Sequence, residues 1–221
     1  MKIEGNYTQD GYALIRQMVP AEVAQAFLTQ IRKVLKTDVI DLRGAPRIEL
    51  LNRPSLDIYS QQLPFMRTFL WGLTPAMETV AGMPLLPTYC YFRIYQAGDV
   101  CRVHADRPAC EHSLSLTIGL SDSRPWPLEV GREVNHDGRP PYDDDFGDEP
   151  FASLAMMPGD GVAYRGVDRR HGRISANPNR WSAHLFCHWI DPDGPHAAEA
   201  FDRRELVEEV DFTFLQDTVP A

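Results

Sequence analysis

A histidine and an aspartate two positions apart, His104 and Asp106, are the residues of this chain best suited to chemistry. In an extended backbone, residues two apart point to the same side, so one imidazole and one carboxylate can hold a single cation. Two ligands make a poor metal site. His171, in the segment RGVDRRHGR after a PGDG turn, is the candidate for the third. Two histidines and one carboxylate on one face leave the other octahedral positions open, which is typical of non-haem iron(II) sites.

Arg180, nine residues after His171, is a candidate anchor for an anion. A guanidinium is planar, always charged and able to donate two parallel hydrogen bonds, so it suits the far carboxylate of a dicarboxylate co-substrate. An arginine at the start of a strand is commonly only a solvated charge. The prediction for Arg180 therefore depends on its combination with the metal ligands.

The elements that must position these residues are expected to be helical in the first part of the chain. Apolar residues recur every four positions after Pro20, which predicts one face of an amphipathic helix: Val23, Phe27, Ile31 and Leu35. A second helix is expected over residues 55 to 80, because Gly82 and Pro84 lie just past its end.

Strands are expected in the rest of the chain. They are predicted at residues 87–95, 112–120, 152–157, 162–166 and 180–190. The strands at 152–157 and 162–166 are expected to form a hairpin around the PGDG turn. Residues 131–150 are rich in Gly, Pro and Asp and predict a long loop, and a short helix is expected around 197–210. Helices followed by many strands indicate an α+β fold built on a β-sandwich or jelly roll.

The chain length of 221 residues suits a single domain with a sizeable core. We expect a helical N-terminal part at about 1–84, a jelly-roll core at about 85–195 and a C-terminal tail at 196–221. Asp160 is expected to be a turn residue, and the acidic residues 143–145 a solvated loop.

Alternation in two predicted strands separates polar from apolar faces. From Arg180 to residue 190, the even positions carry Arg180 and His184, while the odd positions are wholly apolar and must be covered by the N-terminal helices. Tyr91, Arg93 and Tyr95 share one face of the first strand. Tyr91, Arg93 and His184 are therefore candidate substrate contacts. For Arg93, the alternative is an internal ion pair with an acid such as Glu111.

Composition narrows the class of partner. The formal net charge is −9 and the basic residues are scattered, so no general attraction to nucleic acid or anionic membranes is expected. No segment approaches the roughly 18 consecutive apolar residues of a membrane span, and the N-terminus lacks the apolar core of a signal peptide. The four cysteines contain no C-x-x-C pair, which favours reduced thiols and a soluble, cytoplasmic protein.

The motifs of the chain resemble those of a known family. The matching segments lie between about residues 85 and 195 and read YFRIYQAGDVCRVHADRPACEHSLSLTIGL, PWPLEV, PGDGVAYRGVDRRHGR and NRWSAHLFCHWIDPDGP. In order and spacing they resemble the Fe(II)/2-oxoglutarate-dependent dioxygenases, on the side of the prolyl-4-hydroxylase-like branch. The resemblance implies a double-stranded β-helix, a distorted jelly roll with helices packed on one sheet.

The resemblance also implies roles for single residues. Iron would be bound by His104, Asp106 and His171. Arg180 would hold the distal carboxylate of 2-oxoglutarate, and Tyr95 matches a tyrosine that often touches this co-substrate.

The activity implied is oxidation by Fe(II), 2-oxoglutarate and O₂, usually hydroxylation of a C–H bond in a small molecule, amino acid or peptide side chain. The intact carboxylate of Asp106 argues against the halogenating variants. Two alternatives stay open: a nucleic-acid demethylase of the same superfamily, which the acidic charge opposes, and a metal-binding jelly roll without turnover. The primary substrate and the oligomeric state are not indicated by any residue.

Overall fold

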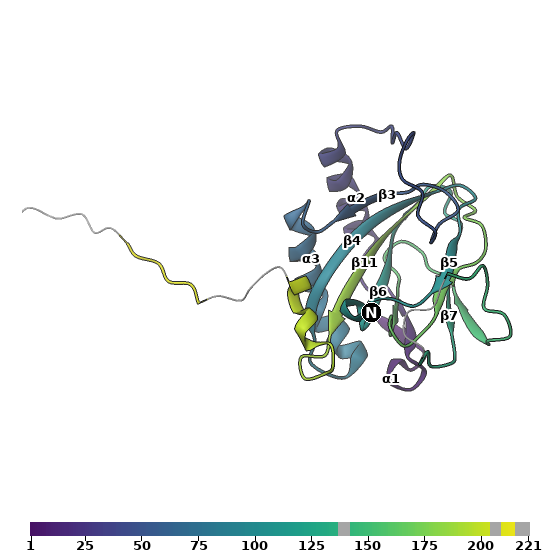
Figure 1. The fold of residues 1–221 in the computed structure, drawn as a ribbon. Helices are drawn as coiled ribbons and strands as arrows, with labels where there is room; N and C mark the ends of the chain where they lie inside the picture. Colours follow the sequence, from purple (N-terminus) through teal and green to yellow (C-terminus); the bar gives the residue numbers. More distant parts are fainter. Residues whose placement is uncertain (137–141, 204–208, 215–221) are drawn as a thin grey trace, which may run out of the picture.

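The computed structural model of the protein describes residues 1–136, 142–203 and 209–214. Helices and strands alternate in the first part and strands dominate afterwards (Figure 1). In chain order the elements are β1 (Lys2–Glu4), α1 (Tyr7–Asp10), β2 (Tyr12–Arg16), α2 (Ala21–Leu35), β3 (Leu56–Tyr59), α3 (Pro64–Ala81), β4 (Leu86–Gln96), β5 (Cys101–His104), η1 (Pro108–Cys110), β6 (His112–Leu120), β7 (Leu128–Gly131), β8 (Phe151–Leu154), β9 (Gly161–Tyr164), β10 (His171–Arg173), β11 (Trp181–Ile190) and η2 (Ala197–Arg203).

The strands form two antiparallel sheets. The larger has seven strands in the order β1-β2-β9-β6-β11-β4-β3, and the smaller has four in the order β5-β10-β7-β8. Helices α2 and α3 lie on the outer side of the larger sheet, and β5 and β7 lie across from it (Figure 1). The predicted α+β jelly roll is confirmed.

The apolar face predicted for the last strand is covered by the two long helices. Residues of α2, α3 and β11 belong to one buried cluster, to which β11 contributes Ala183, Leu185, Cys187 and Trp189. Trp189 also donates its indole N–H to Thr74 Oγ1 of α3 at 2.9 Å. The opposite, even-numbered face of β11 is thereby turned towards the smaller sheet.

Two expectations for the N-terminal part are corrected by the structure. The helix expected from residue 55 begins at Pro64, because residues 56–59 form β3 and pair with β4 at the edge of the large sheet. Proline fits the first turn of a helix, where no partner exists for its missing N–H. Residues 12–16 form β2, which pairs with β1 and β9. Both strands have only four or five residues, too few for periodicity to distinguish them from helix.

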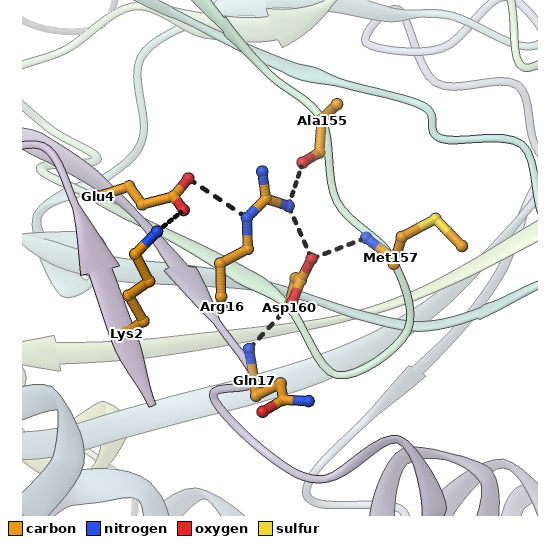
Figure 2. Close-up of polar contacts among 7 residues, drawn as sticks. All are labelled: Lys2, Glu4, Arg16, Gln17, Ala155, Met157 and Asp160. Atoms are coloured by element: carbon orange, nitrogen blue, oxygen red, sulfur yellow. Dashed lines mark hydrogen bonds and ion pairs between the residues drawn. The ribbon is translucent and has the colours of Figure 1, made fainter.

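The predicted hairpin around the PGDG turn is also wrong. Strand β8 pairs with β7 in the small sheet, whereas β9 pairs with β2 and β6 in the large one, so the turn passes between sheets. The carboxylate of Asp160 accepts hydrogen bonds from Arg16 Nη1 at 2.8 Å and from the backbone N–H groups of Gln17 at 2.9 Å and Met157 at 3.1 Å (Figure 2). Asp160 is a structural turn residue, as predicted.

The 131–150 loop is fastened by ion pairs where it is described. Asp143 lies 2.6 Å from Arg170, and Asp144 lies 2.9 Å from Arg102. Both acids are therefore paired with arginines. Residues 137–141 of the predicted loop fall outside the described residues.

Two further predictions concern the whole described chain. All four cysteines are buried free thiols, in agreement with the absence of a disulfide framework. In the described ranges, no helix has the length and apolar character needed to cross a membrane.

Candidate metal centre

The fold brings the three predicted metal ligands together. Strands β5 and β10 are antiparallel neighbours whose register sets His171 opposite His104, and Asp106 follows two residues after His104. Nε2 of His104 lies 3.6 Å from Asp106 Oδ1, and Nε2 of His171 lies 3.5 Å from Asp106 Oδ2. The three ligand atoms all lie within 4.8 Å of one another.

Hydrogen bonds fix the tautomer of both imidazoles. Nδ1 of His104 lies 2.8 Å from the carbonyl oxygen of Arg102, and Nδ1 of His171 lies 2.9 Å from that of Arg169. A carbonyl oxygen only accepts, so Nδ1 carries the proton in each ring and Nε2 keeps its lone pair. Burial lowers the pKa of both histidines to about 4, and the neighbouring His171 adds to the effect on His104. Both rings are thus neutral at pH 7, as metal ligands must be.

Gly166 makes room for the carboxylate. The Asp106 N–H donates to the Gly166 carbonyl at 2.8 Å, and a Cβ at Gly166 would come within 2.6 Å of Asp106 Oδ2 and 2.4 Å of the Cys110 carbonyl. Only glycine fits this approach. Two imidazole nitrogens and one carboxylate, converging from one side, form a donor set that fits octahedral iron(II) with open positions.

The predicted residues of strand β4 line the same cavity, which lies between the two sheets. Tyr91, Arg93 and Tyr95 border it together with the three ligands. Tyr95 is buried and packs edge-on against Trp126, with ring centroids 4.9 Å apart.

Arg93 already has an acidic partner. Its Nε and Nη2 lie 2.7 Å and 2.6 Å from the two carboxylate oxygens of Asp57, a bidentate pair between β4 and β3. The internal ion pair considered for Arg93 therefore exists, with Asp57 in place of Glu111. The Glu111 carboxylate instead accepts from the Asp191 N–H at 3.0 Å.

Arg180, a predicted site residue, does not lie with the metal ligands. Its side chain is 77% exposed and lies 3.2 Å from Asp122. It borders an outer groove together with helix α2 and Trp181. Arg180 precedes the first residue of β11, and its own N–H donates to Asp122 at 2.7 Å. The alternation of β11 therefore does not carry it into the cavity.

A second arginine, missed by the sequence analysis, does line the cavity. Arg173 is 1% exposed and follows His171 by two positions on β10, hence on the same face. Its Nη1 donates to the Trp126 carbonyl at 2.5 Å, its Nη2 donates to Ser115 Oγ at 3.2 Å, and its guanidinium carbon lies 4.8 Å from the Trp126 ring centroid. In an extended backbone, residues two apart point to the same side, so the rule that pairs Asp106 with His104 also pairs Arg173 with His171.

Arg173 is a buried cation without an ion-paired acid among the described residues. Its Nε has no hydrogen-bond partner in this part of the chain, and burial lowers its pKa. The nearby Glu129 is occupied, because its oxygens accept from Ser153 Oγ at 3.0 Å and from the Ile174 N–H at 3.2 Å. An isolated buried charge is costly, so this guanidinium is suited to an anionic ligand.

Two further histidines extend the site. His184 is buried, and its Nδ1 lies 3.3 Å from Arg173 Nη2, so it contacts the arginine. His188 lines the metal cavity, and its Nδ1 lies 2.8 Å from Ser113 Oγ. A ring nitrogen of His188, a carboxylate oxygen of Asp106 and the Cys110 thiol also lie within 4.8 Å of one another. The sequence alone does not indicate a role for His188.

Of the comparisons with known proteins, the one with solved structures finds similar folds. No protein-family model matches the chain, and no curated protein sequence matches it. Among solved structures, the chain is similar to SnoK, a non-heme alpha-ketoglutarate-dependent carbocyclase from nogalamycin biosynthesis, with a TM-score of 0.64 and 14% identity over 85% of this chain and 82% of that one.

Two other solved structures carry the same similarity. A Pseudomonas putida prolyl-4-hydroxylase matches with a TM-score of 0.55 and 15% identity, covering 83% of this chain and 94% of that one. A 2OG-Fe(II) oxygenase family oxidoreductase from Burkholderia pseudomallei matches with a TM-score of 0.55 and 15% identity, covering 83% and 86%. At these identities the likeness is one of fold. The resemblance found in the sequence therefore extends to the double-stranded β-helix that it implied.

Proposed function

We propose that the protein is an iron(II)- and 2-oxoglutarate-dependent oxygenase that hydroxylates a C–H bond. One observation carries this proposal: the two histidine Nε2 atoms and the Asp106 carboxylate converge in a buried cavity that also holds the guanidinium of Arg173. When bound, iron(II) supplies the oxidative chemistry, in which O₂ converts 2-oxoglutarate to succinate and CO₂ while the substrate is hydroxylated.

The chain's own residues hold and orient the reactants. His104, Asp106 and His171 would hold the metal, and a donor set of two histidines and one carboxylate leaves coordination positions for the co-substrate and O₂. The backbone carbonyls that accept from the Nδ1–H groups keep the two rings in the metal-binding tautomer.

The distal carboxylate of 2-oxoglutarate is assigned to Arg173 in preference to Arg180. Arg173 is buried in the cavity and Arg180 is exposed outside it. A guanidinium with an unused Nε–H can add charge-assisted hydrogen bonds to a carboxylate. Tyr95, which borders the same cavity, is kept as a second co-substrate contact, and His184 positions the Arg173 side chain.

The substrate is a small molecule, an amino acid or a peptide side chain. The similar structures include a carbocyclase of natural-product biosynthesis and a prolyl hydroxylase, so the shared fold serves different substrates. The net charge of −9 supports a substrate other than nucleic acid. Four reduced thiols support a cytoplasmic location.

Metal titration tests the proposal. Under anaerobic conditions the protein should bind one Fe(II) per chain and develop a visible charge-transfer band when 2-oxoglutarate is added. His104→Ala, Asp106→Ala and His171→Ala should each abolish stable iron binding, whereas the exposed His136→Ala should retain it. Full iron occupancy in all three ligand variants would refute the site. Iron binding without O₂-dependent succinate release would favour the non-catalytic metal-binding jelly roll.

A further inference from the structure

A surface recess of about 450 Å³ lies beside the metal cavity, because its Tyr59 and Tyr89 stack on Tyr91 and His188 of the cavity lining. Its walls include Tyr59, Tyr89, Arg107 and Asp202. Arg107 directly follows the metal ligand Asp106 in the chain. A ligand bound to Arg107 would therefore lie close to this candidate metal ligand.

The recess and the metal cavity share a wall of stacked side chains. The guanidinium carbon of Arg107 lies 4.4 Å from the Tyr89 ring centroid, and the Tyr89 ring lies 4.7 Å from that of His188, which lines the cavity. Tyr91 stacks with Tyr59 at 5.4 Å and 25°, so a row of aromatic faces leads from the surface to the cavity. Tyr59 is 42% exposed and offers its ring to solvent.

A carboxylate of the chain itself occupies the cationic end of the recess. Asp202 Oδ1 lies 2.7 Å from Arg107 Nη2, and Asp202 Oδ2 accepts from Gln61 Nε2 at 3.2 Å. Glu199 Oε2 lies 4.0 Å from Arg107 Nη1. The Arg107 side chain is 41% exposed while that of Asp202 is 9% exposed, so solvent reaches the cation beside the inserted acid.

The segment that carries Asp202 is held in an unfavourable backbone conformation. Phe201, Asp202 and Arg203 have φ values of 54°, 55° and 56°, directly after Ala200 at φ −49° and ψ 137°. The left-handed region is disfavoured for residues with a Cβ, and consecutive occupancy adds to the cost. The contacts of Asp202 with Arg107 and Gln61 stabilise this conformation, which becomes easier to leave when those contacts are lost.

We propose that Arg107 binds the carboxylate of the primary substrate. In the absence of substrate, the carboxylate of Asp202 occupies this position on Arg107, and the substrate displaces it. The substrate class is a small organic acid with a planar group that lies on the tyrosine row. This assignment of the recess to the substrate rests on the proposed oxygenase function. Arg93, the other cation beside the tyrosines, is bound by both oxygens of Asp57 and is 4% exposed, so it is not the recognising group.

The test is calorimetric titration with benzoate, with benzamide as the uncharged probe. It is run on the metal-free protein and on protein loaded anaerobically with Fe(II) and 2-oxoglutarate. Removing the internal competitor by Asp202→Asn should tighten benzoate binding by about threefold to tenfold, and Arg107→Gln should weaken it by about tenfold or more, as for a charge-assisted hydrogen bond. Benzamide should bind more weakly than benzoate and should not respond to Asp202→Asn.

The matched control is the exposed Arg180–Asp122 pair outside the recess. Asp122→Asn and Arg180→Gln should leave the benzoate affinity unchanged. An unchanged affinity in Asp202→Asn, or equal binding of benzamide, overturns the proposal and leaves the Arg107–Asp202 pair a structural contact. The gain expected for Asp202→Asn cannot arise from misfolding, so the result stands if Arg107→Gln does not fold.

The outcomes also separate this proposal from the oxygenase function. Arg107-dependent benzoate binding together with failed Fe(II) and 2-oxoglutarate titrations would overturn only the oxygenase function. Normal Fe(II) and 2-oxoglutarate binding with no effect of Arg107 or Asp202 on benzoate would overturn only the substrate site.

Discussion

Each histidine ligand donates its Nδ1–H to the backbone carbonyl two residues earlier, His104 to Arg102 and His171 to Arg169. The same short-range contact thus fixes both rings, although they lie on strands that are far apart in the sequence. A ring held in this way loses little rotational freedom when it binds a cation. The orientation of both rings is therefore a property of the chain itself.

The two arginines can be compared directly. Arg173→Lys keeps the charge but loses the planar fork, so the apparent affinity for 2-oxoglutarate should fall by about tenfold to a hundredfold while iron binding persists. Arg180→Lys should leave both constants unchanged, because Arg180 is exposed and paired with Asp122. Titration of 2-oxoglutarate into the iron-loaded variants measures this. The reverse pattern would restore Arg180 as the anchor.

The predicted residues that the structure brings together in one site are those whose selection depends on local geometry. His104 and Asp106 follow from the two-residue repeat of extended backbone, and the same rule finds Arg173 once His171 is accepted. Arg180 was selected by its distance along the chain, and such a distance does not fix where a side chain lies. The sequence does not indicate the partner of Arg93, because Asp57 lies in a predicted helix. In the structure, strand β3 pairs with β4 and sets Asp57 opposite Arg93.

At the scale of elements, the loop between β9 and β10 brings Gly166 against the metal ligand. Gly166→Ala would set its Cβ 2.6 Å from Asp106 Oδ2 and 2.4 Å from the Cys110 carbonyl, so the carboxylate must move. We expect iron affinity to fall by about tenfold or more, since misplaced ligands or their supports typically cost that much. Competition with a metal-binding dye measures the affinity.

A glycine in a helix provides the control for this substitution. A Cβ at Gly72, within α3, meets no heavy atom within 4 Å. Gly72→Ala should therefore retain iron and stabilise the fold by up to about 1 kcal/mol. Equal iron affinity in Gly166→Ala and the wild type would contradict the steric account of the Asp106 position.

Long periodic elements are predictable from the sequence, whereas most of the short ones are not. Helix α2 and strand β11 each repeat their apolar pattern over at least ten residues, and both were found. Strands β1, β2 and β3 have three to five residues, too few to show a period, and β2 and β3 pair with the distant strands β9 and β4. For the same reason β8 and β9 were joined wrongly, because pairing with other strands overrides the turn between them.

At the scale of the whole molecule, closing two sheets around a polar cavity buries an unusual set of titratable groups. Five of the seven histidines are buried: His104, His112, His171, His184 and His188. Four of them lie on strands whose inner faces meet at the cavity, and His112 bonds through Nδ1 to the Tyr7 hydroxyl at 2.7 Å. The stability of the fold is thereby linked to pH.

The sign of this linkage follows from the direction of the pKa changes. Burial lowers the pKa of His104, His112 and His171 from 6.5 to about 4, and that of His188 to about 3. Between pH 6.5 and 4 the unfolded chain therefore binds protons that the folded chain excludes, so stability is complete above this window and falls as the pH is lowered through it. Asp99 acts in the opposite direction, because burial raises its pKa to about 6, and burial also raises the pKa of Glu111 and Glu129. These three carboxyls are outnumbered by the five histidines whose pKa burial lowers.

The metal-free protein should therefore unfold on mild acidification. One histidine with such a change in pKa costs about 3 kcal/mol at the acid end of the window, and several together rival the about 5–15 kcal/mol that stabilises a domain. Urea unfolding at intervals from pH 8 to pH 5 measures the slope. His112→Gln, which removes a buried histidine that is not a metal ligand, should reduce that slope by up to about one proton. A free energy of unfolding that stays constant from pH 7 to pH 5 would show that the buried rings are protonated in the folded state, in conflict with the neutral ligands on which the metal site depends.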